Sequence, residues 1–106
     1  MTKTIAVMIG NSDDKLSQGD WHAFCDDVDQ AISRTCRYNG TKVHGRFYSL
    51  PNEQWQNACW VIEVDKECAF VLGELRSTLA IACKAYLQQS IAWVEGTTEF
   101  IEASNG

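Results

Sequence analysis

Hydrophobic and polar positions alternate along this chain with two periods, and the changes between them divide it into elements. Residues 3–9 alternate with a period of two, with Ile5, Val7 and Ile9 on one side. This period is typical of a strand with one face on a core, and Gly10 ends it. The pattern predicts a buried strand over residues 3–9.

A helical period follows a polar loop at residues 11–16. Ser17 precedes Asp20 by three residues, as in a capping box, so a helix is expected from Ser17 to about Cys36. Asn39 and Gly40 suit the left-handed turn that ends such a helix. The predicted buried stripe consists of Trp21, Phe24, Val28, Ala31, Ile32 and Thr35.

The middle of the chain predicts an antiparallel hairpin of residues 41–50 and 57–64, the second being the central strand. Pairing Leu50 with Asn57 fixes the register. It sets Phe47 opposite Trp60 and Val43 opposite Val64 on the core face, and on the other face it sets His44 opposite Glu63 and Tyr48 opposite Cys59.

After Asp65, which is expected to act as a cap, a second helix is predicted over residues 66–86. Its apolar stripe consists of Cys68, Leu72, Leu75, Leu79, Ala82 and Tyr86. A last strand covers residues 91–95 and is interrupted by Gly96, and residues 97–101 either extend it or fold back over the sheet. The order βαββαβ predicts an α+β, ferredoxin-like fold in one domain, residues 1–106: a four-stranded antiparallel sheet with two helices on one face.

Composition narrows the classes of partner. The chain has 106 residues, 45% of them hydrophobic, which fits one domain with one core. A net charge of −5 disfavours binding to nucleic acid and to anionic membranes. The apolar run before Gly10 is too short for a signal peptide or a membrane span, so a cytoplasmic location is expected.

The five cysteines, an odd number without a CxxC motif, favour neither a disulfide framework nor a zinc site. No metal or cofactor is expected. Cys68 is the one candidate for reactivity, because the first turn of a helix lowers the pKa of a thiol.

The uncovered face of the predicted sheet is unusually apolar. It comprises Thr4, Ala6, Met8, Tyr48, Cys59, Val61, Ala92 and Val94. A large exposed apolar patch usually marks an interface, so a homodimer joined through sheet faces or strand edges is expected. The alternative is a monomer in which residues 97–101 cover part of the face.

Two segments are candidates for ligand binding. The loop with Asn11, Ser12 and Asp13 lies where a strand ends before a helix; it either caps itself, holds a cation on its carboxylates, or contacts a small polar ligand. Trp55, Gln56 and Asn57 combine a ring with amides, which suits a planar ligand. The alternative for this second segment is that it only packs the loop.

His44 and Glu63 are the candidates for catalysis, as a general base with its orienting carboxylate, and Tyr48 lies on the same predicted face. Such a pair is equally consistent with ordinary cross-strand complementarity. The first helix is acidic, which favours a solvated face or a docking surface for a basic partner. The acidic residues are Asp20, Asp26, Asp27 and Asp29.

Three segments, GNSDDKLS at 10–17, WQNACW at 55–60 and SIAWVEGTTEF at 90–100, resemble small bacterial proteins of the mobile gene cassette kind. The resemblance implies an accessory protein and assigns no functional residue. The element order also resembles ACT-like regulatory domains, although their proline-glycine turn is missing here, and dimeric α/β-barrel proteins.

Together these observations favour a non-enzymatic homodimer that binds a small ligand or a protein. A small enzyme that uses His44 with Glu63, and an acidic decoy of a nucleic-acid-binding protein, are the alternatives.

Overall fold

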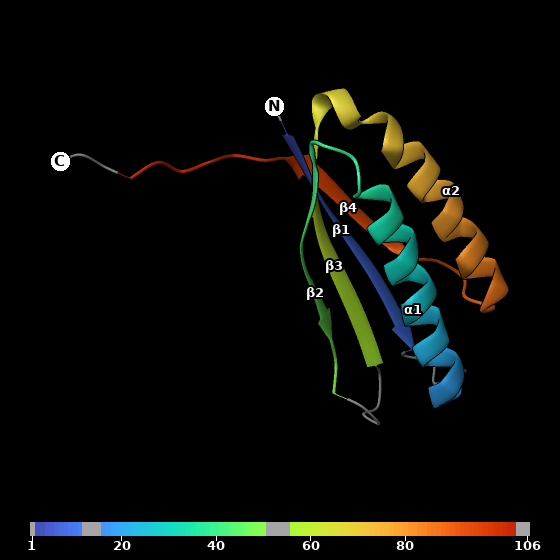
Figure 1. The fold of residues 1–106 in the computed structure, drawn as a ribbon. Helices are drawn as coiled ribbons and strands as arrows, with labels where there is room; N and C mark the ends of the chain where they lie inside the picture. Colours follow the sequence, from blue (N-terminus) through green and yellow to red (C-terminus); the bar gives the residue numbers. More distant parts are fainter. Residues whose placement is uncertain (1, 12–15, 51–55, 104–106) are drawn as a thin grey trace.

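The computed structural model describes residues 2–11, 16–50 and 56–103, which form one sheet and one layer of helices (Figure 1). In chain order the elements are β1 (Thr2–Asn11), α1 (Gln18–Thr35), β2 (Thr41–Tyr48), β3 (Gln56–Asp65), the short 3₁₀ helix η1 (Lys66–Cys68), α2 (Phe70–Ala85) and β4 (Ala92–Thr97). The strands are antiparallel in the order β2-β3-β1-β4, and both helices cover the same face. The predicted ferredoxin-like architecture is confirmed.

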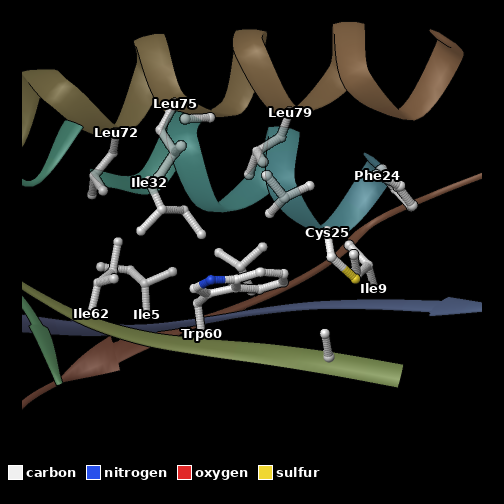
Figure 2. Packing of buried hydrophobic residues seen from close by; sticks show 14 of the residues in the cluster. Ile5, Ile9, Phe24, Cys25, Ile32, Trp60, Ile62, Leu72, Leu75 and Leu79 are labelled. Carbon is white, nitrogen blue, oxygen red and sulfur yellow. The ribbon is translucent and has the colours of Figure 1, made fainter. Parts of the chain in front are cut away.

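The core lies between the helices and the two central strands, β1 and β3. Trp60 is fully buried on β3, and its indole lies between the strands and the helices, as Figure 2 shows. Ile5 and Val7 of β1 are also fully buried, as the alternation predicted. From α2 the core receives Val71, Leu72, Leu75 and Leu79.

The first helix begins as its capping signal indicates. The Ser17 hydroxyl accepts a hydrogen bond from the Asp20 amide at 3.1 Å, which satisfies one of the amides that a helix start leaves without a partner. After the helix, Gly40 turns the chain with φ of +91°. A β carbon there would lie 3.0 Å from Asp65 Oδ2 and Cys68 Sγ, so the turn requires glycine.

The predicted hairpin register is wrong. Val43 pairs with Ile62, and an irregularity between Val43 and Gly45 then shifts the pairing, so that Phe47 lies opposite Cys59. A bulge adds one residue to one strand and reverses the phase of every side chain after it. Phe47 therefore lies on the uncovered face, 62% exposed, and Tyr48 lies on the helix side, where its ring meets Trp60 edge-on at 5.8 Å.

The second helix begins later than predicted. Asp65 is the last residue of β3, and η1 precedes α2, which starts at Phe70. Asp65 makes no side-chain capping bond to η1. Cys68 thus lies in the 3₁₀ turn, where its thiol donates to the Asn39 carbonyl at 3.0 Å. Its predicted place in the first turn of the long helix is wrong.

The end of the chain also differs from the prediction. Gly96 does not interrupt the last strand, because it pairs with Thr4 inside β4. Residues 98–103, called here the tail, form no helix or strand. The tail leaves the body on the side away from the helices, so it does not fold back over the sheet (Figure 1).

In the part of the chain that the structure describes, neither helix has the length and apolar character needed to cross a bilayer.

Candidate functional site

Asn11 ends β1 with a fully buried side chain whose role is structural. Its amide nitrogen donates to the Leu16 carbonyl at 3.1 Å, and its oxygen accepts from the Leu16 amide at the same distance. Both ends of the side chain therefore close the loop after β1. Ser12 and Asp13, predicted with it as ligand contacts, lie outside the described residues.

Gln56 pairs with Asn11 across the sheet and is 3% exposed. Its amide exchanges two hydrogen bonds with the Gln18 amide, at 2.7 and 3.0 Å. The neighbouring Asn57 is exposed on the other side of β3, and its backbone amide donates to the Ser49 hydroxyl. Trp55 lies outside the described residues. The structure thus brings Asn11 and Gln56 to one end of the sheet and separates Asn57 from them.

Gln18 and Gln56 form one wall of a pocket, called here the α1 pocket, between the start of α1 and the ends of β2 and β3. Its volume is about 310 Å³, and it is lined by Gln18, Trp21, His22, Cys25, Asp26, Tyr48, Ser49 and Gln56. Rings and amides thus line the same cavity, the mixture expected around a small planar ligand. The sequence did not link three of the lining residues, Trp21, His22 and Tyr48, to this site. Tyr48 reaches the pocket only because the bulge turns it to the helix side.

Two titratable groups of the α1 pocket, the Cys25 thiol and the Tyr48 phenol, stay protonated at neutral pH because their pKa values are raised. Burial, with the Asp26 carboxylate, raises the pKa of Cys25 to about 11. Burial, with the Asp29 carboxylate, also raises the pKa of Tyr48. A thiol and a phenol in this state offer hydrogen bonds and neither is an activated nucleophile. The lining of the pocket therefore suits the binding of a small molecule through ring contacts and hydrogen bonds.

His44 and Glu63 meet on the uncovered face of the sheet. His44 Nε2 lies 3.4 Å from Glu63 Oε1, and both side chains are partly exposed to solvent. Tyr48 faces the helices instead, so the three side chains proposed for proton transfer do not share one site. Arg46, on the same side as Tyr48, contacts Asp29 of α1 at 2.7 Å.

A second, larger hollow runs between α2, the turn after it and β4, and is called here the α2–β4 groove. Its volume is about 700 Å³. The Arg76 guanidinium stacks 4.4 Å from the Trp93 ring centre, and Glu95 accepts hydrogen bonds from both residues. These bonds, that of Trp93 foremost, lower the pKa of Glu95. Sequence reasoning missed the groove, although Arg76 and Lys84 lie eight residues apart on one helix.

The uncovered sheet face carries several exposed apolar side chains. Its exposed members include Phe47, Met8 and Val94, the last of them 56% exposed, and they surround the half-buried Ala6 and Val61. Lys42, His44 and Glu63 lie toward the β2 edge. Tyr48, predicted here, is replaced by Phe47 because of the bulge.

The described residues contain no group of three or more histidine, cysteine or acidic side chains that could hold a metal ion. All five cysteines are free. Burial raises the pKa of Cys36 to about 11, as expected for a thiol used in packing.

The sequence matches no protein-family model, and no curated protein matches it. Solved structures resemble it in fold. A de novo designed protein, Foldit4, is 12% identical with a TM-score of 0.65, over 93% of this chain and all of that one. A dimeric ferredoxin-like protein of unknown function from Bacteroides fragilis is 15% identical, with a TM-score of 0.55, over 92% of this chain and 95% of that one.

A dimeric ferredoxin-like protein of unknown function from Thermobifida fusca is 14% identical, with a TM-score of 0.54, over 92% of each chain. At these identities the likeness defines the class by fold alone: a small ferredoxin-like α+β domain.

Proposed function

We propose that this protein functions as a homodimeric binding domain whose two copies pack through the uncovered sheet face. The observation that carries the proposal is the contrast between the two faces: Phe47 of β2 and Val94 of β4 are exposed on the uncovered face, whereas the two helices cover the core residues of the other face. Burial of apolar area is worth about 25 cal/mol per Å², so a second copy is the simplest way to remove this surface from water.

Two similar structures, from Bacteroides fragilis and Thermobifida fusca, are described as dimeric ferredoxin-like proteins. They support self-association as a use of this fold. Their identities of 15% and 14% carry neither an interface nor a ligand to this chain.

Sedimentation equilibrium of the full chain tests the dimer. The wild type is expected to be dimeric at micromolar concentration. Val94→Glu places a carboxylate in the interface and is expected to weaken the dimer at least about tenfold. The matched control is Ile81→Glu, because Ile81 is an exposed isoleucine on α2. A wild type that is monomeric at all concentrations refutes the proposal.

The second part of the proposal is that the domain binds a small planar molecule in the α1 pocket. Trp21 and Tyr48 supply ring surface there, and the Gln18 and Gln56 amides and His22 supply hydrogen bonds. A volume of about 310 Å³ suits a single heterocycle better than a larger cofactor. The ligand class we favour is an uncharged or weakly basic heterocycle, because Asp26 lines the pocket.

A thermal-shift screen of planar heterocycles tests this part, since a ligand that binds only the folded state raises Tm. Compounds that stabilise the wild type are expected to lose their effect on Gln18→Ala and His22→Ala. Gln89→Ala, at the other groove, is the control and keeps the shift. Hits whose shift survives both pocket variants bind elsewhere and contradict the assignment.

The alternatives draw less support. His44 and Glu63 lie exposed on the face proposed for dimerisation, without Tyr48. Of the acidic residues of α1, Asp29 contacts Arg46 and Trp60, and Asp27 accepts from Tyr86. Those two carboxylates already have partners inside the domain, which weakens the case for an acidic decoy.

A further inference from the structure

The groove and the tail have complementary chemistry, and no residue of the tail, 98–103, lines the groove of its own copy. We propose that the tail of one copy docks in the α2–β4 groove of the other. Phe100 and Ile101 would contact the apolar floor of the groove, and Glu99 and Glu102 would face its cations. The inference rests on the proposed dimer and adds to it the exchange of a segment between the two copies.

The groove suits an acidic apolar segment. Its floor is apolar and includes Leu79, Ile91 and Trp93, and its rim carries Arg76 and Lys84. Among the described residues no acidic side chain lines it, in a chain whose net charge is −5. The nearby Glu95 carboxylate forms ion pairs with both Arg76 and Lys3. Lys84 has no ion pair among the described residues. The groove is therefore locally basic.

The turn after α2 gives a second, independent reason. The backbone N–H of Gln88 donates to the Cys83 carbonyl, and the backbone N–H of Leu87 donates to the Lys84 carbonyl. These two bonds are those of a Schellman motif. Glycine usually occupies the left-handed position, but here it is Leu87, with φ of 56°. Its side chain lines the groove and is 85% exposed. A leucine held in this conformation with most of its side chain exposed is available for a contact with another copy.

The tail leaves the body in the right direction. Thr98 fixes its start, because its amide donates to the Thr2 carbonyl at 3.0 Å and its hydroxyl bonds to Thr4 on the uncovered face. Beyond that point the tail runs away from the helices (Figure 1). Phe100 is 70% and Ile101 94% exposed. In a dimer packed through the sheet faces, the tail would run toward the partner.

The tail is also long enough. Ile101 is the fourth residue of the tail, so an extended tail places it about 13 Å from Thr97, and packed sheets lie about 10 Å apart. The tail can thus bring Ile101 across the interface to the edge strand β4 of the partner, beside which the groove lies. The four strands, of 10, 8, 10 and 6 residues, lie about 4.8 Å apart and offer about 550 Å² of flat area, below the roughly 800 Å² per partner of a standard interface. Exchanged tails would supply the difference.

A disulfide cross-link tests the contact directly, because Cys83 lines the groove. The full chain carrying Ile101→Cys, with Cys59→Ser to remove the thiol on the uncovered face, is oxidised mildly and examined on a non-reducing gel. A covalent dimer is expected, and it should disappear when Cys83→Ser is added. A covalent dimer that persists with Cys83→Ser overturns the inference, as does a cross-link found only within one chain.

Complementation separates exchange from self-docking. The tail variant Phe100→Ser/Ile101→Ser and the groove variant Leu87→Gly are each expected to weaken the dimer at least about tenfold. Mixed together, they should form a heterodimer tighter than either homodimer, because one intact tail then meets one intact groove. A mixture without recovery indicates docking within one chain and overturns the exchange.

Sedimentation equilibrium also distinguishes this failure from that of the proposed function. A dimeric wild type whose Kd neither variant changes refutes the exchange and leaves the dimer standing. A wild type that is always monomeric refutes the dimer and the exchange together.

Discussion

The two faces of the sheet consist of neighbouring residues on the same strands, yet they have opposite environments. On β3, Trp60 and Ile62 are fully buried beneath the helices, whereas Val61 and Cys59, between and beside them, remain partly open to solvent. Both faces are apolar, so hydrophobic character alone does not distinguish them. One face is completed by the chain itself, and we propose that the other is completed by a second copy.

The largest expected effect of a single substitution is on the covered face. Trp60→Ala removes a fully buried ring and is expected to lower the free energy of unfolding by about 3 to 5 kcal/mol, because the surrounding helices cannot collapse into the space. Urea denaturation measures it. The matched change on the open face, Phe47→Ala, should cost under about 1 kcal/mol at monomeric concentrations. Equal losses at the two positions would contradict the comparison.

The strand phases that the sequence could predict are those without an irregularity. In β1 and β3 the alternation is strict, and Ile5, Val7, Trp60 and Ile62 are buried as expected. The phase of β2 was predicted correctly only as far as His44, which meets Glu63 on the uncovered face. From Gly45 on, the added residue reverses the phase of the strand, and this exchanged the predicted faces of Phe47 and Tyr48.

Gly45 was the available signal, because glycine inside a strand often marks a bulge. The alternation of residues 41–50 was regular enough to hide it. The candidate site depended on that phase: only with Tyr48 on the helix side do Gln56 and Gln18 become the wall of a pocket. The groove escaped prediction for another reason, since its shape arises from the turn at Leu87, and a leucine gives no warning of a left-handed conformation.

The second prediction concerns the polar edge of the covered face. Asp29 accepts hydrogen bonds from Trp60 Nε1 at 3.0 Å and from Arg46 at 2.7 Å. Asp29→Ala leaves the indole N–H without its partner and is expected to cost about 1 to 3 kcal/mol in urea denaturation. Asp26→Ala, which removes an exposed carboxylate from the same helix, is the control and should be nearly neutral. A neutral Asp29→Ala would show that water replaces the carboxylate.

The third prediction has the opposite sign. Leu87→Gly relieves a left-handed conformation that costs a leucine about 1 kcal/mol, so the monomer is expected to gain about that much stability. Thermal unfolding at concentrations below the Kd of the dimer measures the gain. Leu87→Ala, which shortens the side chain and keeps the strain, is the control. A loss of stability on Leu87→Gly would mean that the side chain packs within its own copy.

The smallest expected effect depends on pH. Tyr86 stacks on Phe24 and donates a 2.6 Å hydrogen bond to Asp27. This bond, with burial, raises the pKa of the phenol from 10 to about 12. A raised pKa means that the folded state holds the proton more tightly, so this stabilisation is complete below pH 10 and is lost as the pH rises to about 12.

Tyr86→Phe keeps the ring and removes the titration. It should cost under about 1 kcal/mol at neutral pH and flatten the fall in the free energy of unfolding between pH 10 and 12. Urea denaturation along a pH series measures both effects, and Asp27→Asn should give the same flattening because it removes the accepting charge. Parallel curves for wild type and Tyr86→Phe across that range would show that the phenol titrates alike in the folded and unfolded states. The hydrogen bond between α1 and the end of α2 would then make no net contribution to the layer that covers the sheet.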